Sequence, residues 1–157
     1  LTLDIELFTQ SHYRSSIEPG ADLCGLWKDV FLYHWKEESQ HAIVDELEWK
    51  REHARLTTSE RDRAVNDLIE LVAALDGVVR VQAASDADYF VASVGRDLSP
   101  ADEEAVRDVL LKAYRWQYLV SGLREPRFVE VLAALTTAAQ MRRIGAALAP
   151  ILAHVGD

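Results

Sequence analysis

The sequence predicts an all-α fold, an antiparallel bundle of about five helices. Its 157 residues include only seven glycines and four prolines, and these helix breakers gather in a few places along the chain. Between those places apolar residues recur at helical spacing, and no stretch alternates strictly as a half-buried strand does. Long helices joined by short breaks pack side by side in alternating directions. We therefore expect a single helical-bundle domain over residues 1–157.

The first two predicted helices lie on either side of the Pro19-Gly20 break. The first spans about residues 3–17 and turns a partly polar stripe inward, made of Leu3, Glu6, Gln10, Tyr13 and Ile17. The second spans about residues 22–55, roughly 50 Å at 1.5 Å per residue. Its predicted buried stripe comprises Leu23, Trp27, Val30, His34, Glu38, His41 and Asp45.

The remaining helices are predicted from their start and stop signals. Ser59 is expected to cap the third helix, which reaches about residue 94. Ser99-Pro100 opens the fourth helix, which reaches about residue 121. The fifth spans about residues 127–148, and Pro150 is expected to end or kink it. The inward stripe of the third helix is predicted as Leu68, Leu71, Leu75, Val79, Gln82, Asp86 and Tyr89.

Composition and charge exclude several classes of function. The formal net charge of −9 disfavours phosphate backbones, so we expect no nucleic-acid partner. No run of about 18 uncharged apolar residues is present, so we expect no membrane-spanning helix. Leu1 to Phe8 carry two acids and lack the basic flank of a signal peptide. The single cysteine, Cys24, suits a reducing cytoplasm and is expected to be a small core residue.

The most informative segment is the spacing His34-x-x-x-Glu38-x-x-His41 on the second helix. Around a helix, Glu38 lies about 40° to one side of His34 and His41 about 20° to the other, along roughly 10 Å of axis. Burying such groups without partners costs several kcal/mol. A divalent metal compensates, because imidazole and carboxylate together suit iron, manganese and zinc. The spacing differs from the zinc-protease signature, since no Glu follows His34 directly.

The run His34 to Ala42, with tandem acids and a closing His-Ala pair, resembles the ligand helix of the p-aminobenzoate N-oxygenase family. These are ferritin-like di-iron proteins that activate oxygen. The resemblance implies a ferritin-like bundle and oxidoreductase activity with O2 on a small organic substrate. Because a Glu on the preceding helix also binds iron in that family, it implies Glu6, His34, Glu38 and His41 as iron ligands.

The resemblance covers roughly residues 3–48 and provides about half of a di-iron ligand set. The family uses a further Glu and a further Glu-x-x-His on two earlier helices, and the sequence has no second Glu-x-x-His. Three explanations stay open. The chain is a piece of a longer oxygenase, or two chains pair to complete a site, or the site binds one metal or none. We expect a homodimer.

Three further residues are expected around the metal ligands. Asp45 and Asp86 fall on predicted buried stripes, where each carboxylate either orients a ligand histidine or pairs with an arginine. Tyr13 is expected to hydrogen-bond near the metal. The alternative is a hydrogen-bonded polar cluster without metal, in a bundle that serves as an interaction or oligomerisation domain. A storage or structural metal site is a further alternative.

Overall fold

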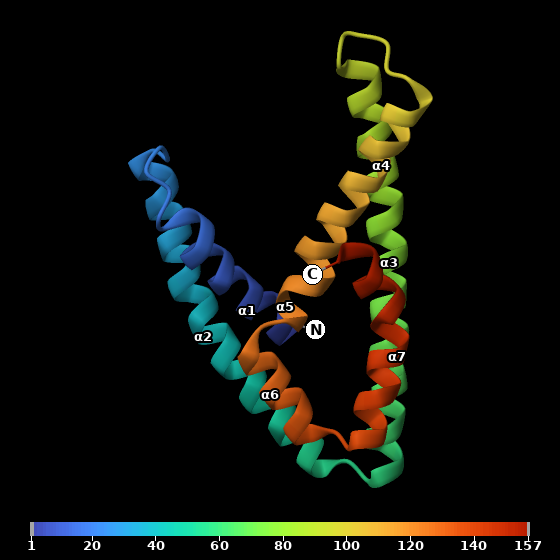
Figure 1. Ribbon diagram of the computed structural model, residues 1–157. Helices are drawn as coiled ribbons and strands as arrows, with labels where there is room; N and C mark the ends of the chain where they lie inside the picture. Colours follow the sequence, from blue (N-terminus) through green and yellow to red (C-terminus); the bar gives the residue numbers. More distant parts are fainter. Residues whose placement is uncertain (1, 157) are drawn as a thin grey trace. The chain divides into compact units, whose positions relative to one another are not determined.

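The computed structural model describes residues 2–156, and the regular elements in that range are all helical (Figure 1). The all-α prediction is confirmed. The elements are α1 Thr2–His12, η1 Tyr13–Ile17, α2 Gly25–Arg55, α3 Thr58–Ser93, α4 Pro100–Arg115, η2 Trp116–Val120, α5 Ser121–Leu123, α6 Pro126–Leu135 and α7 Ala138–Val155, where η marks a π-helical segment. Among the described residues, no helix combines the length and apolar character that crossing a bilayer requires.

Three of the helix starts are fixed by a capping box, in which two residues three positions apart each bond the other's backbone N–H through a side chain. The predicted Ser99 cap of α4 is confirmed, because its hydroxyl accepts from the backbone N–H of Asp102. The predicted Ser59 cap is wrong by two residues. Thr57 caps α3 instead, and its backbone N–H donates to the Glu60 carboxylate at 2.8 Å.

The helix predicted over 127–148 is in fact two helices, α6 and α7. A third capping box separates them, because the Thr137 hydroxyl accepts from the backbone N–H of Gln140 and starts a new helix. The expected end at Pro150 is also wrong, since α7 continues to Val155. One proline removes a single backbone hydrogen bond, which the packing of Ile151 and Val155 offsets.

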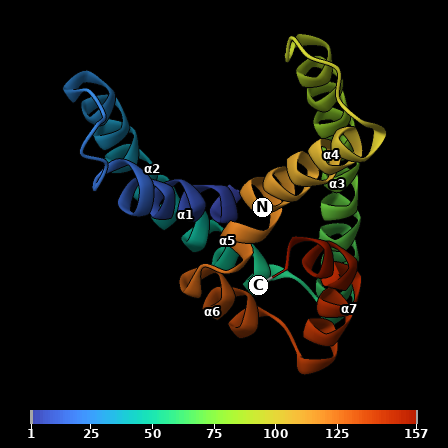
Figure 2. The ribbon, with the colours of Figure 1, turned by 45° about the horizontal axis from the view of Figure 1, so that its top comes forward.

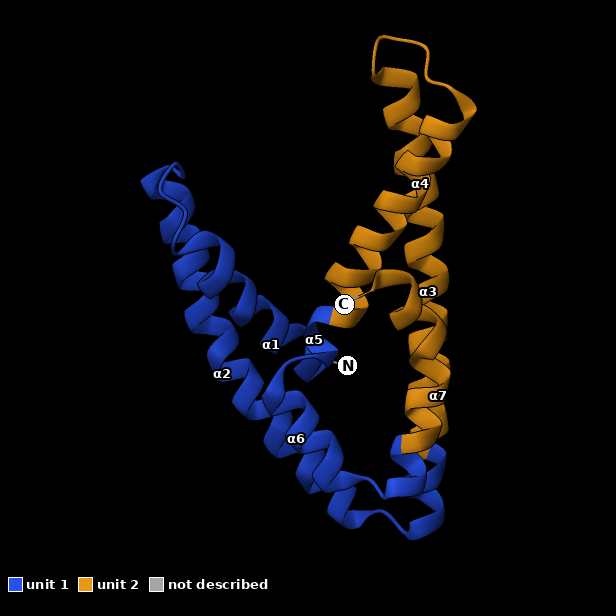
Figure 3. Ribbon diagram, in the orientation of Figure 1, with its two compact units in different colours: residues 1–63, 121–141 blue, residues 64–120, 142–157 orange. Residues whose placement is uncertain are grey.

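The chain divides into two compact units, residues 1–63 with 121–141 and residues 64–120 with 142–157 (Figure 3). In unit 1, α1 and α6 both pack along α2, as Figures 1 and 2 show. Trp49 of α2 lies against Phe128 of α6, with ring centroids 5.9 Å apart. The apolar core of this unit includes Leu3, Leu7, Tyr13, Ile17, Ala42, Phe128, Val131 and Leu132.

In unit 2, α4 and most of α7 pack against α3. Three polar contacts join α4 to α3. Arg115 forms a two-pronged ion pair with Asp76 at 2.7 and 2.8 Å, and the Tyr114 hydroxyl donates to Asp86 at 2.6 Å. Arg107 donates to Asp88 at 2.6 Å. The apolar core beside them consists of Val72, Leu119, Val120, Ile151 and Val155.

The phase of two long helices differs from the prediction. On α2, Trp27 and Val30 are half exposed rather than buried. On α3, Leu71 and Tyr89 are exposed. Val79 is buried as predicted, but the other buried residues of this helix are Val65, Val72, Ala83 and Ala87. Cys24 was expected in the core but is exposed, just before the first residue of α2. A periodic pattern fixes the angles between residues on one helix, whereas the neighbouring helices decide which side they cover.

The start of α1 is held against α5 by a close backbone approach at Gly122. A methyl group on this glycine would lie 2.7 Å from the backbone oxygen of Asp4, which is too close for a van der Waals contact. Asp4 itself is buried, and burial followed by the negative charge of Glu125 raises its pKa to about 6. This contact fixes the start of α1, the helix that carries Glu6.

Candidate metal centre

Three residues from α1 and α2 bring potential ligand atoms together in unit 1. Glu6, Glu38 and His41 each offer one such atom, and these atoms all lie within 4.8 Å of one another. The two helices are held in register beside the group, because Gln10 of α1 donates to the backbone oxygen of Glu38 at 3.3 Å. Gln10 lies one turn after Glu6 on the polar stripe of α1, which was its only signal in the sequence.

Glu38 lies at the centre of the group, between two imidazoles. Its Oε2 is 2.9 Å from Nδ1 of His41, and its Oε1 is 3.2 Å from Nδ1 of His34. Glu6 forms a side-chain hydrogen bond with Glu38, and its Oε1 is 4.0 Å from Nδ1 of His41. The sequence-predicted residues His34, Glu38, His41 and Glu6 are thus neighbours, although His34 is outside the group that meets within 4.8 Å.

The two acids and the two histidines differ in exposure. The side chains of Glu38 and Glu6 are 13% and 18% exposed, whereas those of His34 and His41 are 45% and 51% exposed. The prediction that both imidazoles point into the core is therefore wrong. The side of α2 that packs on its neighbours is rotated by roughly 60° from the predicted stripe, toward Trp35 and Ala42.

The electrostatics of the group follow from this burial. Burial, the hydrogen bond with Glu38 and the negative charges of Glu38 and Asp45 raise the pKa of Glu6 to about 7. The hydrogen bonds from Glu6 and His41 hold the pKa of Glu38 below its usual value. The hydrogen bond to Glu38 raises the pKa of His41. Near neutral pH, Glu38 is thus a carboxylate anion. It accepts hydrogen bonds from the protonated forms of Glu6 and His41.

The three residues expected around the metal ligands, Asp45, Asp86 and Tyr13, lie in different parts of the structure. Asp45 is in unit 1, one turn after His41 on α2, and its charge acts on Glu6. Asp86 belongs to unit 2, where its carboxylate accepts hydrogen bonds from Tyr114 and Gln82. The ring of Tyr13 packs against Trp35 with centroids 5.6 Å apart.

Aromatic side chains fill the space between α1 and α2 beyond the group. Trp35 lies one turn before Glu38 and carries the guanidinium of Arg14 over its ring at 5.2 Å. Further along the same pair of helices the rings form a chain of contacts: Phe8 on His12, His12 on Phe31, and Phe31 on Trp27. These ring contacts join α1, η1 and α2 on the N-terminal side of Glu38.

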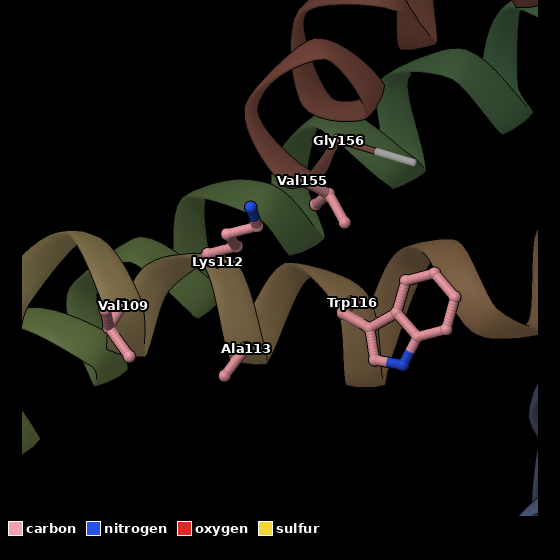
Figure 4. A pocket seen from close by; sticks show the side chains of 6 residues that line it. All are labelled: Val109, Lys112, Ala113, Trp116, Val155 and Gly156. Atoms are coloured by element: carbon pink, nitrogen blue, oxygen red, sulfur yellow. The ribbon is translucent and has the colours of Figure 1, made fainter.

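A pocket of about 420 Å³ is present in unit 2 (Figure 4). Its lining contains no acid or imidazole, so it lacks the donors of a metal site. It offers apolar walls and one ammonium group, from Lys112. The lining residues are Val109, Lys112, Ala113, Trp116, Val155 and Gly156.

The donor set of Glu6, Glu38 and His41 fits a first-row divalent ion. Two carboxylates and an imidazole are ligands that iron, manganese and zinc accept, and ion binding replaces the protons held by Glu6 and His41. The half-exposed imidazoles leave one side of the group accessible to solvent. Comparisons with protein families, curated proteins and solved structures find no match to this chain.

Proposed function

We propose that this protein is a ferritin-like iron protein that uses O2 to oxidise a small organic substrate. Iron binds to Glu6, Glu38 and His41, with His34 on the other side of Glu38. The observation that carries this proposal is the convergence of three ligand atoms within 4.8 Å between α1 and α2. The resemblance of His34 to Ala42 to the ligand helix of a di-iron oxygenase family supports the same chemistry.

The geometry of Glu38 favours two metal ions over one. Each of its oxygens faces a different imidazole, so Glu38 would help to hold one ion together with His41 and a second ion together with His34. When bound, iron supplies the redox chemistry for O2 activation. The protein holds the ligands, shifts its carboxylates as the charge of the metal changes and excludes water with the rings around Trp35.

A second copy of the chain completes the ligand set in this proposal. Residues 1–157 provide about half of the ligands of a di-iron site, and large apolar side chains on α2 are exposed, including Leu26 and Tyr33. Exposed apolar surface marks sites of protein association. We therefore propose a homodimer in which both chains contribute to metal binding.

The second candidate function is a metal-free interaction domain. It is favoured by a specific observation: Glu6, Glu38 and His41 already satisfy one another by hydrogen bonds. A polar cluster of this kind stabilises a helix pair without metal. In that case the exposed apolar side chains of α2 are the functional surface.

Metal analysis of matched variants tests the proposal. Protein purified without added metal is expected to contain iron near two per chain or per dimer. Glu38→Ala and His41→Ala are expected to lower metal affinity by more than about 100-fold, beyond the effect of losing an outer partner. His53→Ala is the matched control, because this histidine is on the same helix and outside the group.

The outcomes separate the candidates. A folded wild-type chain that binds neither added Fe²⁺ nor Mn²⁺ would refute the iron proposal and favour the interaction domain. Iron binding without O2 consumption in the presence of a reductant would leave a storage or structural metal site. Manganese or zinc in place of iron would keep the site and change the reaction.

A further inference from the structure

Asp45 carries a buried carboxylate oxygen that has no hydrogen-bond donor. Its Oδ2 is shielded from solvent and has no partner among the described residues. Buried polar atoms in folded proteins nearly always have a partner, and an unpaired one costs about 1–3 kcal/mol. An oxygen of this kind beside a group of potential metal ligands indicates a missing partner with positive charge.

Asp45 is on the same face of α2 as Glu38 and His41. It follows His41 by four residues and Glu38 by seven, and both spacings keep side chains on one face of a helix. Across the interface, Asp45 is close enough to Glu6 of α1 for its charge to act on that carboxyl. Glu6, Glu38 and His41 thus meet within 4.8 Å, and Asp45 is a third acid on the same face of α2, outside that group.

The charges in this region are not balanced by the protein. Among the described residues, the ion pairs of Glu6 and Glu38 involve only the imidazoles of His34 and His41, and Asp45 has none. A divalent cation bound between the carboxylates offsets this excess of negative charge. The terminal torsion of aspartate is broad, so its oxygens turn toward a cation without movement of the helix.

We propose that Asp45 is a direct fourth ligand of the ion held by Glu6, Glu38 and His41. The inference rests on the proposed metal function and adds a ligand to it. It replaces the role expected from sequence, in which Asp45 orients a ligand histidine from outside. The ion then has three carboxylates and one imidazole, a donor set that favours iron or manganese over zinc.

Co²⁺ binding, followed by visible absorption, tests this assignment in the full-length chain. Asp45→Asn is expected to shift the visible bands of bound Co²⁺ and to weaken its binding by more than tenfold. Asp29→Asn makes the same charge change at an exposed position on α2, about 24 Å along the helix, and is expected to change neither property. The melting temperature of metal-free Asp45→Asn is expected to be no lower than that of the wild type, because the substitution removes an unpaired buried anion.

A second variant keeps the test decisive if Asp45→Asn folds poorly. In a Cys24→Ser background, Asp45→Cys places a thiolate at position 45. Direct ligation then produces the strong near-ultraviolet cobalt–thiolate charge-transfer band, which Asp29→Cys in the same background cannot produce.

Each outcome decides the assignment. Shifted visible bands, or a charge-transfer band from Asp45→Cys only, support Asp45 as a ligand. Unshifted bands with no charge-transfer band overturn it and return Asp45 to an outer role, while the metal function stands. Failure of the wild type to bind Co²⁺ removes the metal function and this inference together.

Discussion

Among single residues, Glu6 and His41 decide the electrostatics of the candidate site. Both side chains bind a proton more strongly than usual, at the place where a cation would bind. The side chains of Glu6 and Glu38 form a hydrogen bond, which requires a proton on one of the two carboxyl groups, and Nδ1 of His41 lies 2.9 Å from Oε2 of Glu38. Burial places the pKa of Glu6 at about 7, and the pKa of His41 is also raised. A metal ion competes with both protons, so binding is coupled to pH.

Metal affinity is therefore expected to rise with pH between 6 and 8. Below pH 7 Glu6 keeps its proton, which the ion must displace, and above pH 7 the carboxylate is free to bind. The gain is expected to be at least about tenfold over this range, with net proton release on binding. Calorimetric titration with Mn²⁺ in buffers of different ionisation enthalpy measures both quantities.

Glu6→Gln is the control for that pH dependence. It removes one titrating group, so it is expected to bind more weakly and to release fewer protons. An affinity that is flat or falls from pH 6 to 8 would contradict the assignment of Glu6 as a ligand.

The spacing of His34, Glu38 and His41 was visible in the sequence because the three residues are on one helix. Glu6 was named only through a resemblance, and the structure places it within 4.8 Å of Glu38 and His41. The unpaired oxygen of Asp45 had no sequence signal beyond a position on the same stripe. Whether a buried atom finds a donor depends on residues from other elements.

At the scale of elements, α1 is held in place at its start by α5. Gly122 allows the backbone of α5 to approach Asp4, two residues before Glu6. The hydrogen bond from Gln10 to the backbone of Glu38 holds the other end of α1 against α2. The position of Glu6 relative to Glu38 and His41 therefore depends on packing outside this group.

Gly122→Ala is expected to lower the free energy of unfolding by about 1–3 kcal/mol and to weaken metal binding. The added methyl group meets the backbone oxygen of Asp4, which no change of rotamer can move, so α1 must shift. Urea denaturation and Mn²⁺ titration check the two effects.

Gly77→Ala provides the matched control within α3. A methyl group there meets nothing within 4 Å, and alanine favours a helix over glycine by roughly 0.5–1 kcal/mol. It is expected to stabilise the protein slightly and to leave metal affinity unchanged. Equal effects of the two substitutions would show that Gly122 has no special packing role.

Across the molecule, large apolar side chains remain exposed on the two long helices, α2 and α3. Leu26 and Tyr33 of α2 are 76% and 68% exposed, and Val81 and Tyr89 of α3 are similarly open. Single exposed apolar residues are ordinary, but several on one helix beside a partial ligand set favour association.

The protein is expected to form a dimer in solution, with twice the 17.7 kDa mass of the chain. Light scattering after size-exclusion chromatography measures this mass with and without metal. Glu38→Ala is expected to keep the dimer mass, because apolar contacts rather than metal ligands hold the pair. A single-chain mass at all concentrations would contradict completion of the site by a second copy.

The helical class, the capped start of α4 and the spacing of His34, Glu38 and His41 on α2 could all be predicted from the sequence. These features are local, since helix periodicity and capping depend on residues a few positions apart. The tertiary structure alone decided which side of α2 faces α1, and so why Glu38 is buried while His34 and His41 stay half exposed. It also left one oxygen of Asp45 without a hydrogen-bond partner among the described residues. Periodicity sets the angles between residues on one helix, but the phase of that helix against its neighbours follows from contacts between residues far apart in the chain.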